Sequence, residues 1–175
     1  MHWNRSTCDY VQFTDEQIEM ITGLLMGDGD LHGRTDPNPH FRLRMTNREF
    51  LLELDSNWDV LSTGVFLDRS AEDQYESALQ NQRRGVDGFE TVNRSGYNDL
   101  YGVRTCSHPQ LGKFRNWYAN GKKRFPDHLE LTPLITKMWY ACDGWLADEQ
   151  TARARAMFKT TNESDRPAYL IELFE

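Results

Sequence analysis

The sequence predicts an α+β protein in which a unit of helix, hairpin, helix, hairpin and helix occurs twice, with the second copy incomplete. Three observations support this fold class. Two stretches match without a gap at an offset of 115 residues, each copy has a helical apolar pattern that ends in Asp-Gly, and residues 40–45 alternate between apolar and basic side chains. The chain therefore divides into a first repeat, residues 1–125, and a second, truncated repeat, residues 126–175.

The two motif helices are predicted from their caps and their apolar spacing. Thr14 opens a capping-box pattern, so a helix is expected over residues 15–28, with a break at Gly29. In the second copy, Thr132 precedes a proline at the first helical position, which predicts a helix over residues 134–143. Each helix thus places an aspartate at its carboxyl end.

Glycine spacing on the first helix predicts a close contact with another helix. Gly23 and Gly27 are four residues apart, which gives a flat face that another backbone can approach. The matching positions of the second copy hold Met138 and Cys142, so we expect an asymmetric or looser crossing in which both of these residues pack in the core.

The region after the first helix predicts strands with a cationic face. Residues 40–45 form a strand with Arg42 and Arg44 on its wet side. A second capping box at Thr46 opens an amphipathic helix that is expected to reach Gly64.

The rest of the first repeat predicts a hairpin, a helix and a linker. Residues 80–106 are expected to form a hairpin with Arg94 and Arg104 on its strands. A helix follows over residues 107–121, in which His108 caps or packs, and residues 122–127 form a linker whose cations face phosphate or solvent.

Charge is unevenly distributed along the chain. The 175 residues have a net charge of -7 and a pI of about 5.2, yet residues 80–125 carry 9 basic and 3 acidic side chains. Local cation density suits a nucleic-acid surface, because affinity for nucleic acid depends on Lys and Arg along one surface and not on the total charge. A solvated charged face is the alternative. The acidic total, with 15 Arg against 5 Lys, favours the salt-rich cytosol of a halophile.

Composition also excludes several classes of protein. The apolar runs are far shorter than the ~20 residues of a membrane span, and the N-terminal residues lack a signal-peptide core, so a cytoplasmic protein without membrane association is expected. The three cysteines are widely spaced, which predicts reduced thiols and neither a disulfide framework nor a zinc site.

The stretch Ile21–Gly29, ITGLLMGDG, resembles the nine-residue motif that names the LAGLIDADG homing endonucleases. Gly23 matches the first glycine of that motif, and the final Asp-Gly is present. Residues 139–144, WYACDG, resemble the second motif in the branch of the family that reads WYMDDG. The residues before it, Ser107–Pro109 and Asn120–Lys123, also resemble that branch. The resemblance extends over residues 13–162.

The resemblance implies a saddle-shaped endonuclease that cuts double-stranded DNA at a long, specific site, usually for an intron or intein. It implies that Asp28 and Asp143 are the catalytic, metal-binding residues and that antiparallel strands read the major groove. Mg²⁺ is the expected cofactor, because it binds hard oxygen ligands, often one or two carboxylates together with phosphate. The candidates for DNA contact are Arg42, Arg44, Arg94, Arg104 and Lys159.

Several alternatives stay open at this stage. An Asp-Gly pair can simply end a helix at a turn, and exposed arginines are commonly solubilising. The second copy lacks the counterpart of residues 61 onward. The chain is therefore a monomer with two motifs, a fragment, or a protein that self-associates to complete the missing wall, which is the DNA-facing sheet of the second copy. The endonuclease competes with a non-cleaving DNA- or RNA-binding module such as a splicing helper, with a truncated inactive remnant, and with a small acidic interaction protein.

Overall fold

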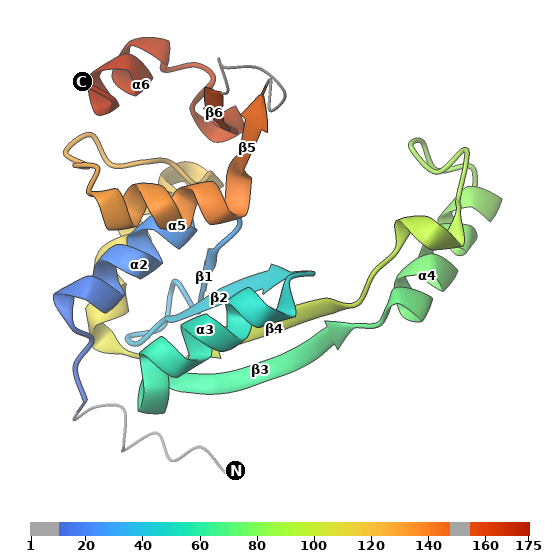
Figure 1. The fold of residues 1–175 in the computed structure, drawn as a ribbon, viewed down its shortest axis with the longest axis horizontal. Helices are drawn as coiled ribbons and strands as arrows, with labels where there is room; N and C mark the ends of the chain where they lie inside the picture. The colour runs from blue at the N-terminus through green and yellow to red at the C-terminus, as the bar shows by residue number, and fades with distance from the viewer. Residues whose placement is uncertain (1–10, 148–154) are drawn as a thin grey trace.

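A computed structural model describes residues 11–147 and 155–175. Figure 1 shows two helices from distant parts of the chain, α2 (Asp15–Met26) and α5 (Pro133–Asp143), side by side next to an antiparallel sheet. The sheet has the strand order β1-β2-β4-β3 and is crossed on one face by α3 (Arg48–Trp58). Its strands are β1 (Asp30–His32), β2 (His40–Met45), β3 (Ser62–Arg69) and β4 (Leu100–Thr105). The predicted α+β class is confirmed.

The other elements lie at the two ends of the molecule. Helix α4 (Ala71–Arg83) projects away from the sheet, and the hairpin β5 (Gly144–Ala147) and β6 (Arg155–Phe158) lies beyond α5 with α6 (Pro167–Leu173) (Figure 1). Four 3-10 helices complete the description: η1 (Asp59–Leu61), η2 (Arg94–Gly96), η3 (Pro109–Gly121) and η4 (Thr161–Glu163). No helix among the described residues combines the length and the apolar character needed to cross a membrane.

The caps of the two motif helices form as predicted. The Thr14 hydroxyl accepts a hydrogen bond from Gln17 N at 3.2 Å, and the Gln17 side chain accepts one from Thr14 N at 3.0 Å. The Thr132 hydroxyl accepts from Ile135 N at 3.1 Å. Helix α2 ends at Met26, two residues before the predicted end, so Asp28 lies just beyond its carboxyl end.

The crossing of α2 and α5 depends on glycine. A Cβ atom on Gly23 would lie 2.7 Å from Cβ of Met138 and closer still to the carbonyl oxygen of Ile135. A Cβ atom on Gly27 would overlap Cβ of Cys142. The predicted close approach and its asymmetry are therefore confirmed, because each glycine of α2 contacts the larger residue at the matching position of α5. Met138 is buried in the core, as expected.

The sheet has one apolar and one cationic face. Leu31, Phe41, Leu43 and Val103 are fully buried in the core that α3 shares through Leu51, Leu54 and Trp58. On the other face, Arg42 pairs in register with Arg104, and Arg44 follows on the same side. The alternation of residues 40–45 predicted this strand and its cationic side correctly.

The helix predicted from Thr46 to Gly64 is shorter than expected. Its N-cap is Asn47, whose side chain accepts from Phe50 N at 3.1 Å, and it ends at Trp58. Asp59 then takes a positive φ of 47°, and β3 begins at Ser62. The helix ends early because the residues from Ser62 pair with β4 as a strand. This long-range pairing cannot be predicted from the local apolar spacing.

The predicted hairpin over residues 80–106 is wrong. Only β4 is a strand in this region, and it pairs with β2 and β3 instead of with a neighbour. Residues 71–83 form α4, which is capped by Ser70. Gly85 and Gly88, which suggested the hairpin, take positive φ values in the loop after α4, and Gly96 lies in η2. Arg94 therefore lies in the 3-10 helix η2 and not on a strand.

The segment from residue 107 is helical, but its geometry is 3-10 instead of α. His108 is buried, accepts from Gln110 N at 3.2 Å through Nδ1 and packs edge-on against Phe13, which confirms its capping and packing role. Cys142 is a free thiol, whereas Cys106 is disulfide-bonded, so the expectation of three reduced cysteines is wrong for Cys106.

Candidate nuclease site

Two aspartates from different repeats meet where the motif helices cross. Asp28 follows α2, and Asp143 is the last residue of α5. The crossing brings these ends together, because a Cβ atom on Gly27 would lie 3.5 Å from the Asp143 carboxylate. Both aspartates line a cavity of about 470 Å³. Its wall also includes three cations, Arg44, Lys123 and Lys159.

The two carboxylates influence each other electrostatically. Partial burial raises the pKa of Asp143, and the nearby charge of Asp28 raises it further, while Lys159 and Lys123 oppose the shift. Two carboxylates that share a site favour binding of a cation or a proton, since either relieves their repulsion. Burial also raises the pKa of the neighbouring Cys142 thiol to about 12, which keeps it neutral beside them.

Lys123 belongs to this site, which the sequence did not predict. Its ammonium group donates hydrogen bonds to the carbonyl oxygens of Gly27 and, at 2.9 Å, Gly29, on either side of Asp28. Burial lowers the pKa of Lys123, and Asp30, Asp143 and Asp28 oppose that shift. Of the two roles expected for the linker cations, the solvated one is wrong for Lys123, whereas the phosphate-facing one stays a prediction. No local spacing identifies it, because the contact joins positions nearly 100 residues apart.

A third carboxylate, Asp30, lies at the edge of the cavity. The Tyr118 hydroxyl accepts from Leu31 N at 3.0 Å and hydrogen-bonds to Asp30, and burial together with that carboxylate raises the pKa of Tyr118. Asp30 also lies 3.4 Å from His32 Nε2 and 3.9 Å from Arg34. Because three side chains engage it, Asp30 has a supporting position beside the carboxylate pair.

The arginines predicted to contact DNA differ in their ion pairs and in their exposed surface. Arg42 and Arg44 both approach Asp68, Arg42 in a direct hydrogen bond and Arg44 at 3.5 Å. The Arg44 side chain keeps about half of its surface exposed, at 49%, against 21% for Arg42. Arg104 is exposed and stacks over the Phe66 ring at 4.5 Å. These three arginines lie on one sheet face, which we call the cationic sheet face.

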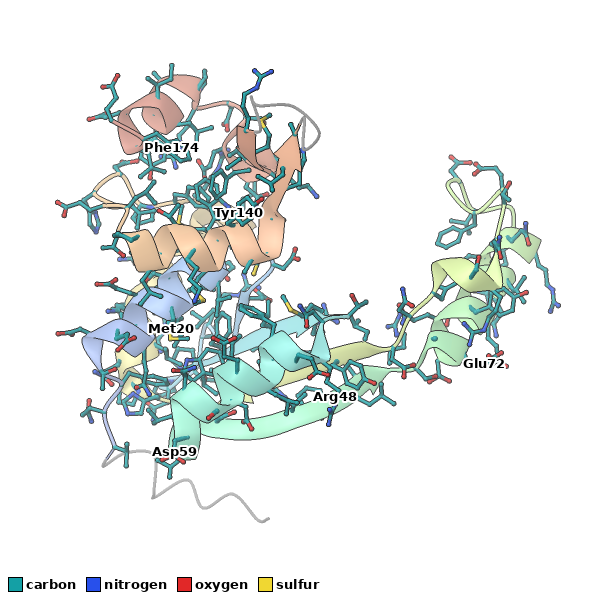
Figure 2. The ribbon with its side chains drawn as sticks, in the orientation of Figure 1. Met20, Arg48, Asp59, Glu72, Tyr140 and Phe174 are labelled. Atoms are coloured by element: carbon teal, nitrogen blue, oxygen red, sulfur yellow. The ribbon has the colours of Figure 1, made fainter. Side chains whose placement is uncertain are left out.

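Arg94 and Lys159 lie in different places. Arg94 bonds to Glu72 at 3.1 Å and lies over the ring of Tyr75, both on the outlying α4. Figure 2 shows Glu72 far from Met20 in the body of the protein, so Arg94 does not join the cationic sheet face. Lys159 follows β6 and reaches the cavity, where its backbone N–H donates to Asp143 O at 3.0 Å.

The donor set fits a hard divalent cation that is completed by substrate. Within residues 11–147 and 155–175, no three His, Cys, Asp or Glu side chains are arranged to hold a metal ion. Mg²⁺ often takes one or two protein carboxylates and fills its remaining positions with water and substrate phosphate. The pair Asp28 and Asp143 meets that requirement and does not provide the closed cage of a zinc site.

Comparison with known proteins adds one finding on fold. No family model matches the sequence, and no curated protein is significantly similar to it. A solved structure of the homing endonuclease I-WcaI bound to its DNA recognition sequence superimposes with a TM-score of 0.70 and 14% identity, covering 94% of this chain and 68% of that chain. The chain therefore has the fold of a homing endonuclease.

Proposed function

We propose that the protein is a site-specific endonuclease that cleaves double-stranded DNA with a divalent metal ion, Mg²⁺ in particular. The observation that supports this most is the meeting of Asp28 and Asp143, one from each repeat, in a cavity that also contains three cations. A DNA-binding fold supports the same conclusion, since the I-WcaI structure holds its recognition sequence.

The residues of the site have separate tasks in this proposal. Asp28 and Asp143 would hold the metal ion, which when bound would activate a water and stabilise the leaving oxygen. Lys123 and Lys159 offset the charge of the phosphate next to the carboxylates. Lys123 is half-buried and hydrogen-bonded in the DNA-free protein, so its ammonium group needs little reorganisation when charge develops on the phosphate.

The cationic sheet face positions the duplex. A two-stranded β-ribbon fits the major groove, where an arginine fork matches O6 and N7 of guanine. Arg104 and Arg44 have the exposure needed for such contacts, while Arg42 is held by Asp68 and serves to orient its neighbours. We therefore assign base or phosphate contacts to Arg104 and Arg44, and a weaker phosphate contact to Lys159.

The decisive experiment measures binding and cleavage separately. Duplexes that bind are selected from a randomised pool in Ca²⁺, then incubated with Mg²⁺ or with EDTA across a KCl series. Cleavage by wild type in Mg²⁺ is expected, with a loss of roughly 10³-fold or more for Asp28→Asn and for Asp143→Asn and with binding in Ca²⁺ retained. Cleavage that survives either substitution would refute the assignment of the carboxylate pair.

A second function is favoured by the small size of the second sheet. Among the described residues it has two strands of four residues, whereas the first sheet has four strands, so it offers less surface to DNA. A DNA- or RNA-binding module without cleavage would follow from that smaller surface. Tight binding of a selected duplex or of RNA, with no product in Mg²⁺ at any salt concentration, is the result that would favour it.

A further inference from the structure

Lys123 occupies its place without support from regular secondary structure. Residues 122–132 contain no helix or strand. Its backbone N–H groups donate few backbone hydrogen bonds, among them Arg124 N to Trp117 O at 2.6 Å and Leu129 N to Pro126 O at 3.1 Å. Because burying an ammonium group is costly, a lysine on such a segment needs contacts that hold its backbone in place.

A buried carboxylate from the C-terminal region supplies those contacts. Glu163 has no exposed surface, and its Oε1 accepts a hydrogen bond from Phe125 N at 2.8 Å. Its Oε2 accepts from Arg166 Nε at 2.7 Å and lies 3.6 Å from Arg124. Both oxygens of Glu163 are therefore engaged by, or next to, the segment that carries Lys123.

Arg124 and Arg166 make further contacts along the segment. Arg166 donates to Phe125 O at 2.8 Å and to Asp127 at 2.6 Å. Arg124 donates to Asp165 at 2.7 Å. Tyr169 of α6 adds a hydrogen bond to Pro126 O at 2.9 Å. The segment is thus held by main-chain contacts at Phe125 and Pro126, two and three residues after Lys123.

Aromatic packing in the core also holds Phe125 in place. The Phe125 ring lies edge-on to Trp139 of α5 at 5.5 Å and tilted against Trp117 at 6.1 Å. Phe125 is therefore held by its ring in the core and by its backbone on Glu163. Because Phe125 is held in this way, the chain two residues earlier is positioned so that Lys123 reaches the carboxylate site.

A cluster of this kind contributes more to geometry than to stability. The desolvation of a buried ion pair cancels much of its attraction, so its net contribution to stability is small, whereas removal of one partner leaves an uncompensated charge. Glu163 with Arg124 and Arg166 specifies one arrangement of the chain around Phe125.

We propose that Glu163, through Arg124, Arg166 and the Phe125 backbone, is a positioning residue that holds the Lys123 ammonium group beside Asp28 and Asp143. The inference rests on the proposed nuclease function for its catalytic consequence, but the placement of Lys123 is a property of the free protein. The C-terminal region thereby contributes to the site without touching substrate.

The first test observes Lys123 directly by NMR in DNA-free protein labelled with ¹⁵N-lysine. The chain has five lysines, so the side-chain ammonium signal of Lys123 is assigned by its loss in Lys123→Arg. A signal protected from exchange is expected in wild type and in the control Glu172→Gln, an exposed acid on α6, and is expected to broaden or disappear in Glu163→Gln. An unchanged Lys123 signal in Glu163→Gln would overturn the proposal.

The second test measures the catalytic consequence by single-turnover cleavage. Glu163→Gln is expected to slow cleavage about 10-fold to 100-fold, since a displacement of about 1 Å in a site has effects of this size, while DNA affinity changes less than about 2-fold. In a Lys123→Ala background, Glu163→Gln should have no further effect, because it acts through Lys123. Additive effects of the two substitutions would contradict a positioning role.

Controls separate this proposal from the nuclease assignment. Arg166→Lys keeps a charge but loses the forked contacts, so it should reproduce part of the Glu163→Gln effect even if Glu163→Gln unfolds the protein. If wild-type protein does not cleave DNA, the proposed function fails, and the NMR signal of Lys123 in the Glu163→Gln and Arg166→Lys variants still decides whether the cluster positions this lysine.

Discussion

In the first repeat, α2 leads into a four-stranded sheet with a cationic face, whereas in the second repeat, α5 leads into a two-stranded hairpin. Positions that hold Asp30 and Arg42 in the first repeat hold Trp145 and Met157 in the second, and these apolar side chains are 49% and 39% exposed. Asp28 lies just beyond the end of α2, and Asp143 is the last residue of α5. The comparison teaches that both helices bring an aspartate to the crossing, although the residues that meet there and the strands beside them differ.

Physical chemistry explains why the crossing is the shared part. The proposed site needs one carboxylate from each motif helix, and the packing of Gly23 and Gly27 against α5 brings the two helix ends together. In a wall, in contrast, each strand adds its own part of the DNA-binding surface. The second sheet has two described strands where the first has four, and Asp28 and Asp143 still line one cavity.

The largest effect on stability is expected at the crossing. Gly23→Ala should lower the free energy of unfolding by about 1–3 kcal/mol, because its methyl group would overlap backbone of α5 and outweigh the better helix propensity of alanine. Gly96→Ala is the control, since nothing lies within 4 Å of that position. Urea unfolding measures both, and equal stability of the two variants would show that the crossing is loose.

The walls are compared by DNA affinity. Arg104→Ala on the cationic sheet face should weaken binding by about 1–3 kcal/mol, the range of a base-contacting arginine. Arg94→Ala, whose guanidinium is paired with Glu72 on the outlying α4, should leave affinity within about 2-fold. Fluorescence anisotropy with a selected duplex measures both. A larger loss for Arg94→Ala would place the DNA on the α4 side instead.

The pairing of Arg42 and Arg44 with Asp68 offers a way to strengthen the first wall. Asp68→Asn should free both guanidinium groups, raise affinity for nonspecific DNA a few-fold and steepen the salt dependence by about one unit of log K against log [salt]. Glu53→Gln on α3 makes the same change in net charge from an exposed position. Salt titrations of the two variants that coincide would mean that only net charge matters.

The smallest expected effect concerns the asymmetry between the two aspartates. Because the pKa of Asp143 is raised in the folded protein, the folded state binds a proton more tightly than the unfolded state, and stability is lost as the pH rises through the folded pKa. Asp143→Asn should therefore stabilise metal-free protein at pH 7 by about 0.5 kcal/mol, a value reduced for solvent screening.

Two conditions should remove that advantage. Near pH 3 the carboxyl group is protonated in both states, so wild type and Asp143→Asn should unfold alike. Saturating Mg²⁺ should stabilise wild type and not the variant, because the ion binds the folded carboxylate pair. Urea unfolding of wild type and Asp143→Asn at both pH values, with and without Mg²⁺, measures these differences in stability. A variant less stable than wild type at pH 7 without metal would contradict a raised pKa of Asp143.

The sequence predicted the parts of the fold that depend on local rules. The Thr14 capping box, the proline after Thr132 and the glycines at the end of the first motif helix each act within a few residues or a single helix turn, and the structure confirms them. The capping box expected at Thr46 is wrong, because Asn47 caps α3 instead. The alternation of residues 40–45 also identified a strand with one cationic side. These features follow from caps and periodicity, which are properties of neighbouring residues.

The errors share a different physical cause. The expected helix ran over the first residues of β3, and β4 was expected to pair within residues 80–106, because strand pairing here joins residues about 40 positions apart and leaves no local signature. The same holds for Arg94, whose neighbours proved to be α4 and not a strand.

The position of each aspartate at a helix end could be read from the repeated Asp-Gly pairs, since helix caps and turns are encoded by adjacent residues. The place of Lys123 beside the carboxylates, and the contacts of Glu163 with its segment, came only from tertiary structure. A buried charge takes its place where the surrounding chain supplies partners for it, and those partners lie about 40 and about 100 residues away in the sequence.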